Sequence, residues 1–132
     1  MKILDITEHS RHEINPDVDV ARIKLATQAV ERYAQNKGIR FKFGSHFFDQ
    51  VVAARGIGTI TAEMILDASA KILKRGLKYF EGKPAATSYA FWDPQNENHI
   101  ILEVFKNADN NYFVRSIVRD TKWYGDSQKI RL

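Results

Sequence analysis

Residues 87–118, TSYAFWDPQNENHIILEVFKNADNNYFVRSIV, decide the fold of this chain. Within them, segments 87–93, 99–105 and 112–118 are rich in aromatic and β-branched residues, which strands prefer. The connecting segments PQNEN and NADNN contain turn-forming residues and little else. Three strands joined by two short loops predict an antiparallel β-meander.

The sequence before this stretch has a helical period instead of a period of two. Apolar residues recur at helical spacing from Val20 to Tyr33. Pro16 suits a first helical turn, and Gly38 follows the apolar run. We therefore predict a first helix over residues 16–36.

Two more helices are predicted between this helix and the strands. The segment SHFFDQVVAAR has Ser45 as its potential N-cap and is followed by Gly56 as a stop signal. The segment TAEMILDASAKILKR has Thr61 as its N-cap and Gly76 as its stop signal. Helices followed by strands predict an α+β fold, with N-terminal helices packed on a small antiparallel β-meander sheet.

The chain length fits a single domain. With 132 residues and 44% hydrophobic residues, residues 1–132 are enough for one core covered by two layers of structure. We expect residues 1–15 to form an arm or, at MKILDI, a short strand, and residues 120–132 to form either a flexible tail or an edge strand.

The composition limits the compartment and the chemistry. The chain has no cysteine, which excludes disulfides and thiolate-bound zinc and favours a reducing, cytoplasmic location. No apolar run approaches the roughly 20 residues that span a membrane, and the first residues do not resemble a secretory signal. His9 and His12 have a metal-binding spacing, but no third ligand lies nearby, so we expect neither a metal nor a cofactor.

Positive charge is concentrated in residues 71–83, KILKRGLKYFEGK. This segment contains five basic residues and one acidic residue, and the whole chain has a net charge of +4. Such clustering is typical of nucleic-acid binding, with Lys74, Arg75 and Lys78 as the expected contacts. A solvated helix end, where basic residues complement the helix dipole, is the alternative explanation.

Strand alternation sorts the meander residues into two faces. Ile100, Leu102 and Val104 form an apolar face, which we expect the helices to cover. Folding the chain about its two short loops predicts a row of Tyr89, Glu103 and Arg115 on the other face. This row is either a cross-strand salt bridge beside a tyrosine or a charged face that holds a phosphodiester.

The helix at residues 45–55 offers a second group of polar side chains. His46 lies one turn before Asp49 and Gln50, and either residue could orient its imidazole. Histidine side chains ordinarily titrate near neutral pH, so His46 is either a solvated residue or a proton donor or acceptor. Arg55 lies on the opposite side of an ideal helix, so one straight helix does not bring it to His46.

These motifs resemble the small RelE-like and phage RegB-like ribonucleases, within the group that includes barnase-like and colicin-type nucleases. The resemblance rests on SHFFDQVVAARGIGTITAEMI followed by SYAFWD, HIILEVF and YFVRSIVRD. It implies that His46 and Arg55 match the helix-opening histidine and the Arg-Gly arginine of these families. Arg115 and Ser116 match polar residues of the last strand. Gln50 departs from the pattern, since the families often have arginine there.

The resemblance implies a metal-independent endoribonuclease that cleaves single-stranded RNA by attack of the 2′-hydroxyl group. Either Glu103 or His46 would be the base and the other the acid. Arg115 and Arg119 would hold the phosphate, Tyr89 would orient the substrate, and Arg55 and Ser116 would also bind it. Such enzymes include toxins and phage messenger-RNA nucleases, so a neutralising antitoxin or immunity protein is an expected partner. The alternatives are a non-catalytic RNA- or protein-binding domain and an inhibitor protein.

Overall fold

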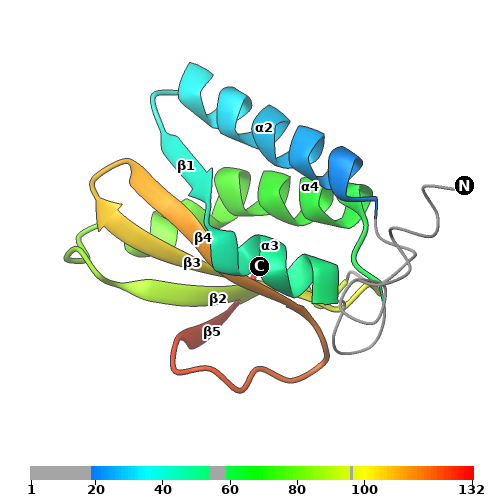
Figure 1. Cartoon of the computed structure of the whole chain (residues 1–132). Coiled ribbons are helices and arrows are strands. Elements are labelled where there is room, and N and C mark those ends of the chain that lie inside the picture. The colour runs from blue at the N-terminus through cyan, green and yellow to red at the C-terminus, as the bar shows by residue number, and fades with distance from the viewer. Residues whose placement is uncertain (1–18, 54–58, 96) are drawn as a thin grey trace, which may run out of the picture.

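A computed structural model describes residues 19–53, 59–95 and 97–132. In these residues the chain forms an α+β fold with three α-helices and a five-stranded mixed sheet (Figure 1). The helices are α2 (Val20–Asn36), α3 (Ser45–Ala53) and α4 (Ala62–Lys71), and the strands are β1 (Arg40–Phe43), β2 (Ser88–Trp92), β3 (Ile100–Ala108), β4 (Asn111–Arg119) and β5 (Gln128–Arg131).

The sheet contains the predicted meander but is larger than it. Its strand order is β1-β4-β3-β2-β5, and β2, β3 and β4 are antiparallel neighbours as the sequence predicts. The expectation of a purely antiparallel meander is wrong, because β1 lies parallel to β4 and β5 lies parallel to β2. Of the two alternatives for residues 120–132, the structure forms the edge strand, β5.

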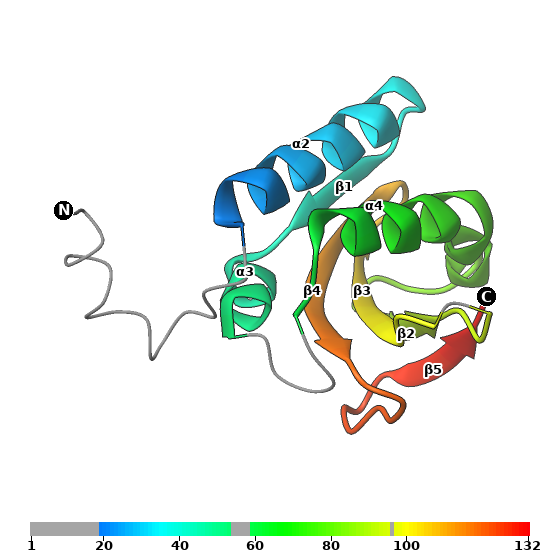
Figure 2. The same ribbon diagram turned by 90° about the vertical axis from the view of Figure 1, so that its right-hand side faces the viewer.

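Two helices cover one face of the sheet. Figure 2 shows α2 and α4 on the same side of the curved strands, with α3 beside β4. Leu102 and Val104 are completely buried, which confirms that the apolar face of β3 lies in the core. Phe80 is completely buried against the sheet, with its ring centroid 4.9 Å from that of Tyr89 and 5.1 Å from that of Tyr112.

The helix caps agree only in part with the sequence. The Thr61 side chain accepts a hydrogen bond from the Met64 N–H at 3.3 Å, which confirms the predicted N-cap of α4. Ser45 is the first residue of α3 rather than its cap, because the carbonyl of Gly44 already accepts from the Phe48 N–H at 3.4 Å. Helix α2 begins at Val20, and Pro16 lies outside the described residues.

Gly76 does not end the third helical segment as predicted. Helix α4 continues as a π-helical turn (η1, Ile72–Gly76) and a 3₁₀ turn (η2, Leu77–Phe80). A Cβ atom at Gly76 would lie 3.2 Å from Phe91 Cε1, so glycine allows this turn to pack closely on the sheet. No helix of the described residues has the length and apolar character needed to cross a bilayer.

Candidate functional site

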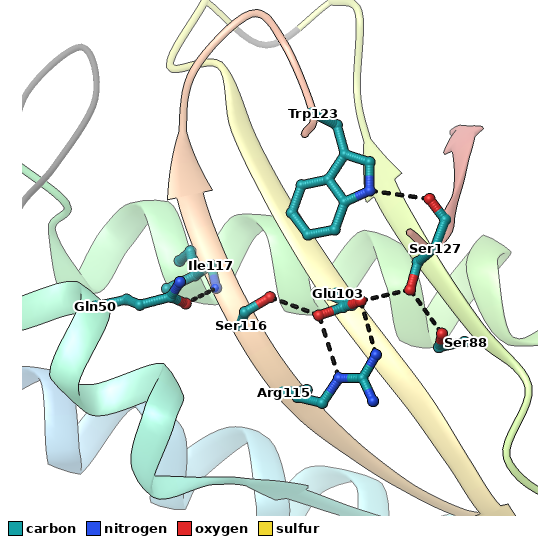
Figure 3. A network of polar contacts seen from close by, with 8 residues as sticks. All are labelled: Gln50, Ser88, Glu103, Arg115, Ser116, Ile117, Trp123 and Ser127. Atoms are coloured by element: carbon teal, nitrogen blue, oxygen red, sulfur yellow. Dashed lines mark hydrogen bonds and ion pairs between the residues drawn. The ribbon is translucent and has the colours of Figure 1, made fainter. Parts of the chain in front are cut away.

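A β-bulge in β4 brings two consecutive side chains to the same face of the sheet. Glu103 pairs with Ser116 and Val104 pairs with Val114, so Arg115 is an extra residue in β4. An extra residue interrupts the alternation of side chains along a strand. Arg115 and Ser116 therefore both lie on the Glu103 side, which faces away from α4 (Figure 3).

Glu103 is the centre of a hydrogen-bond network on this face. Its Oε1 accepts from Arg115 Nε at 3.3 Å and from Ser116 Oγ at 2.7 Å. Its Oε2 accepts from Arg115 Nη2 at 2.9 Å and from Ser127 Oγ. The residue is only 7% exposed, so these four donors replace water as the hydrogen-bond partners of its carboxylate.

The network keeps Glu103 ionised. Burial raises the pKa of Glu103, but the hydrogen bonds from Arg115, Ser127 and Ser116 oppose burial and leave the pKa below its ordinary value. The hydrogen bond to Glu103 in turn raises the pKa of Arg115. At neutral pH the site therefore contains a carboxylate and a guanidinium group, and the carboxylate can accept a proton but cannot donate one.

A loop of residues 120–127 covers part of this network. Ser127 Oγ lies 2.6 Å from Ser88 Oγ, and the Trp123 Nε1–H donates to the Ser127 carbonyl at 2.9 Å (Figure 3). This loop connects β4 to β5, so its attachment to Glu103 also fixes the edge strand. Neither Ser88 nor Ser127 is predictable as a site residue from the sequence, because no pattern in the loop shows where it returns to the sheet.

A pocket of about 480 Å³ opens between α3, this loop and the sheet. Both His46 and Glu103 line it, together with Gln50, Arg115, Ser116, Val118, Asp120, Lys122, Trp123, Tyr124 and Gly125. A second hollow of about 370 Å³ shares His46, Gln50 and Val118 and extends along α3. Volumes of this order are typical of small-ligand sites. The structure thus brings His46, Glu103, Arg115 and Ser116 to one pocket, as predicted from the sequence.

Gln50 has a structural role at this edge of the sheet. Its Oε1 accepts a hydrogen bond from the Ile117 N–H at 2.7 Å. Strand β1 pairs with β4 only as far as Val114, and the Gly44 N–H then donates to the Val114 carbonyl at 3.1 Å. Beyond that point the Gln50 side chain replaces the missing strand as a partner for β4. An arginine at this position would have no acceptor for the Ile117 N–H.

The predicted row of Tyr89, Glu103 and Arg115 is wrong in its first member. Ala90, not Tyr89, is opposite Glu103, and Tyr89 pairs with Val104. A shift of one residue moves a side chain to the other face of a sheet. Tyr89 accordingly packs against Phe80 beneath the helices and does not line the pocket.

Arg119 lies away from the pocket as well. Its Nε donates to the Asn98 carbonyl at 3.0 Å and its Nη1 donates to the Thr59 carbonyl at 2.6 Å. The guanidinium group therefore joins two loops and does not contact Glu103. Arg55, the remaining residue that the resemblance assigned to substrate binding, lies outside the described residues.

The basic segment does not extend the pocket. Lys74, Arg75 and Lys78 are exposed on η1 and η2, whose buried residues pack on the side of β2 that carries Phe91. Phe91 lies on the helix-covered face, whereas Glu103 lies on the opposite face. The sheet thus separates the basic segment from the pocket that contains Glu103 and Arg115.

Within the described residues, no group of three or more His, Cys, Asp or Glu side chains is arranged to hold a metal ion. His9 and His12 lie outside those residues. Comparisons with protein-family models, curated proteins and solved structures find no match for this chain.

Proposed function

We propose that this protein is a metal-independent endoribonuclease that cleaves single-stranded RNA by attack of the ribose 2′-hydroxyl group. The observation that carries the proposal is that His46 and Glu103 line one pocket with Arg115 on the face of the sheet opposite α2 and α4. An imidazole, a carboxylate and a guanidinium group are the side chains needed to move two protons and to stabilise a phosphorane.

The protonation state of Glu103 favours one of the two possible role assignments. Because its pKa is lowered, Glu103 is the base that removes the proton from the 2′-hydroxyl group. The O2′ atom then attacks phosphorus, the bond between phosphorus and O5′ breaks, and a 2′,3′-cyclic phosphate forms. Protonated His46 donates a proton to the leaving O5′ atom.

Arg115 is the residue that contacts the phosphate in this mechanism. Its side chain is 43% exposed while it bonds to Glu103, so part of the guanidinium group is free to contact a phosphate oxygen. A phosphate that draws Arg115 away from Glu103 also raises the basicity of the carboxylate. The Ser116 hydroxyl donates to Glu103 and orients it. Tyr89 and Arg119 have no role in this mechanism.

Three broader assignments belong to the same proposal. The helices, the meander and the leading His46 support a RelE-like or RegB-like fold. The absence of cysteine supports a cytoplasmic location, where RNA is available. An antitoxin or immunity protein that covers the pocket would control the activity.

The proposal is tested by incubating the purified protein with mixed single-stranded RNA in EDTA. We expect cleavage that leaves 2′,3′-cyclic phosphate ends. Single-stranded DNA is the matched control, since it retains the phosphates and lacks the 2′-hydroxyl nucleophile, and we expect no cleavage of it. Intact RNA, or equal cleavage of both substrates, would contradict the proposal.

One observation favours a second candidate, a non-catalytic RNA-binding domain. Glu103 already accepts four hydrogen bonds, which is the arrangement of a structural salt bridge. RNA binding without cleavage in the same assay would support this candidate.

A further inference from the structure

We propose that the open face of the sheet carries a binding track for single-stranded RNA that leads from β1 to the pocket. The track consists of Phe105, Phe113, Arg40 and Lys42, none of which lines the pocket. This inference rests on the proposed function for the identity of the ligand, and it assigns to these residues the binding of nucleotides next to the cleaved bond.

The aromatic part of the track is a cross-strand pair. Phe105 on β3 is opposite Phe113 on β4, and their ring centroids are 5.1 Å apart. Both residues lie on the face away from the helices, because the alternate residues Val104 and Val114 are completely buried. Both phenylalanines remain partly exposed. They therefore form an aromatic platform on a face where solvent can reach them.

Arg115 connects this platform to the pocket. Its guanidinium carbon lies 5.3 Å from the centroid of the Phe105 ring, while its nitrogen atoms bond to Glu103. The aromatic pair is thus directly beside the proposed catalytic carboxylate. A base stacked on the pair would lie close to a phosphate held at Arg115.

The basic part of the track lies on β1. Phe41 and Phe43 point into the core, so Arg40 and Lys42 leave β1 on its other face, where both are exposed at the outer edge of the sheet beside Glu31 and Gln35 of α2. Lys42 is opposite Phe113. The Lys42 ammonium group lies 3.4 Å from Glu31, but its side chain is 50% exposed, and such pairs exchange readily with other anions.

The charge of the sheet selects an anionic ligand. In the five strands, all of which the structure describes, Glu103 is the only carboxylate, and Arg115 balances its charge. Strand β1 itself contributes Arg40 and Lys42 and no acidic residue, and Glu31 of α2 is the carboxylate beside them. Partly exposed aromatic rings next to basic side chains bind unpaired bases and their phosphates, whereas paired bases present no free ring face for stacking.

The test measures binding without cleavage. A fluorescein-labelled 2′-O-methyl oligouridine is titrated with the protein and followed by fluorescence anisotropy at several salt concentrations. The open-face variant is Arg40→Gln with Lys42→Gln, and its matched control is Lys74→Gln with Arg75→Gln on the opposite side of the sheet. Both pairs remove two positive charges, so any effect of net charge alone is the same.

The aromatic variants are Phe105→Leu and Phe113→Leu, which keep an apolar side chain but remove the ring. Tyr79→Leu, at a 37% exposed aromatic residue on η2, is their control. Thermal unfolding of each variant identifies any change in folding.

We expect the open-face charge variant to reduce the slope of log K against log salt by about 1.4, or about 0.7 for each lost phosphate contact. We expect the two leucine substitutions together to weaken binding about tenfold or more, and a complementary strand to abolish the difference. Equal effects of the two charge variants, or equal binding of single strands and duplexes, would overturn the track. Failure of RNA cleavage with these binding results intact would contradict only the proposed nuclease activity.

Discussion

Arg115 and Ser116 are consecutive in the chain, yet both side chains bond to the same carboxylate of Glu103. This arrangement requires the β-bulge, because regular alternation would send one of the two side chains into the core. The bulge thus concentrates polar groups at the point where β3 and β4 pass the pocket. Bulges of this kind commonly re-aim side chains at functional sites.

The ion pair should contribute measurably to stability. Arg115→Met leaves Glu103 buried without its main partner, and we expect a loss of about 1–2 kcal/mol in the free energy of unfolding, since the exposed guanidinium group limits the effect. Arg22→Met is the control, because Arg22 and its partner Glu63 are 61% and 63% exposed. Urea denaturation that gives the same loss for both variants would contradict a structural role for the pair.

Acid should destabilise the protein through Glu103. Its pKa is lower in the folded state than the ordinary value of 4.5, so its stabilising effect is complete above that value and is lost as the pH falls through the folded pKa. Asp93, whose pKa is lowered by the hydrogen bond from Lys71, adds a loss of stability in the same direction as the pH falls. Comparison of the wild type with Glu103→Gln from about pH 7 to about pH 3 isolates the first effect. Parallel stability curves for the two proteins would show that Glu103 is not responsible.

Gln50 offers a direct test of its structural role. Gln50→Ala leaves the Ile117 N–H without a partner, and we expect a loss of about 1–2 kcal/mol. Gln50→Glu keeps an acceptor oxygen and should retain most of the stability. Gln50→Arg introduces an arginine in place of the amide acceptor, and should lower stability and leave RNA cleavage no faster. Faster cleavage by Gln50→Arg without loss of stability would show that this position belongs to the catalytic group.

Gly125 should control the position of Trp123. A Cβ atom at Gly125 would lie 2.8 Å from Trp123 Cε2, so Gly125→Ala should displace the indole from the pocket wall. We expect cleavage to fall about tenfold, with a small fall in melting temperature because the displaced indole also loses its hydrogen bond to the Ser127 carbonyl. Tryptophan emission in a Trp92→Phe background reports the displacement. A shifted emission spectrum with an unchanged cleavage rate would place Trp123 outside the substrate site.

The parts of the fold that were predictable from sequence are those with a strong local period. The alternating residues of β2, β3 and β4 and the cap at Thr61 identify their elements without any tertiary information. Strand β1 has only four residues and gains its pairing from β4, so its short segment carries little signal of its own.

The candidate site was predictable only in part for a related reason. The Glu103 and Arg115 contact follows from a short hairpin loop, whereas the place of Tyr89 depends on a register that one residue can change. The contact of Ser127 with Glu103 depends on how an irregular loop returns to the sheet. The bulge at Arg115 has no compositional mark, since its neighbours are ordinary strand residues.

The central claim is that Glu103 and His46 transfer the two protons of RNA cleavage. It is tested most directly by single-turnover cleavage rates of the wild type, Glu103→Gln and His46→Asn on one RNA in EDTA, with thermal unfolding to verify that each variant folds. We predict that each substitution slows cleavage by about 10²-fold or more, as expected for loss of a general acid or base. Wild-type rates in either folded variant would contradict the assignment.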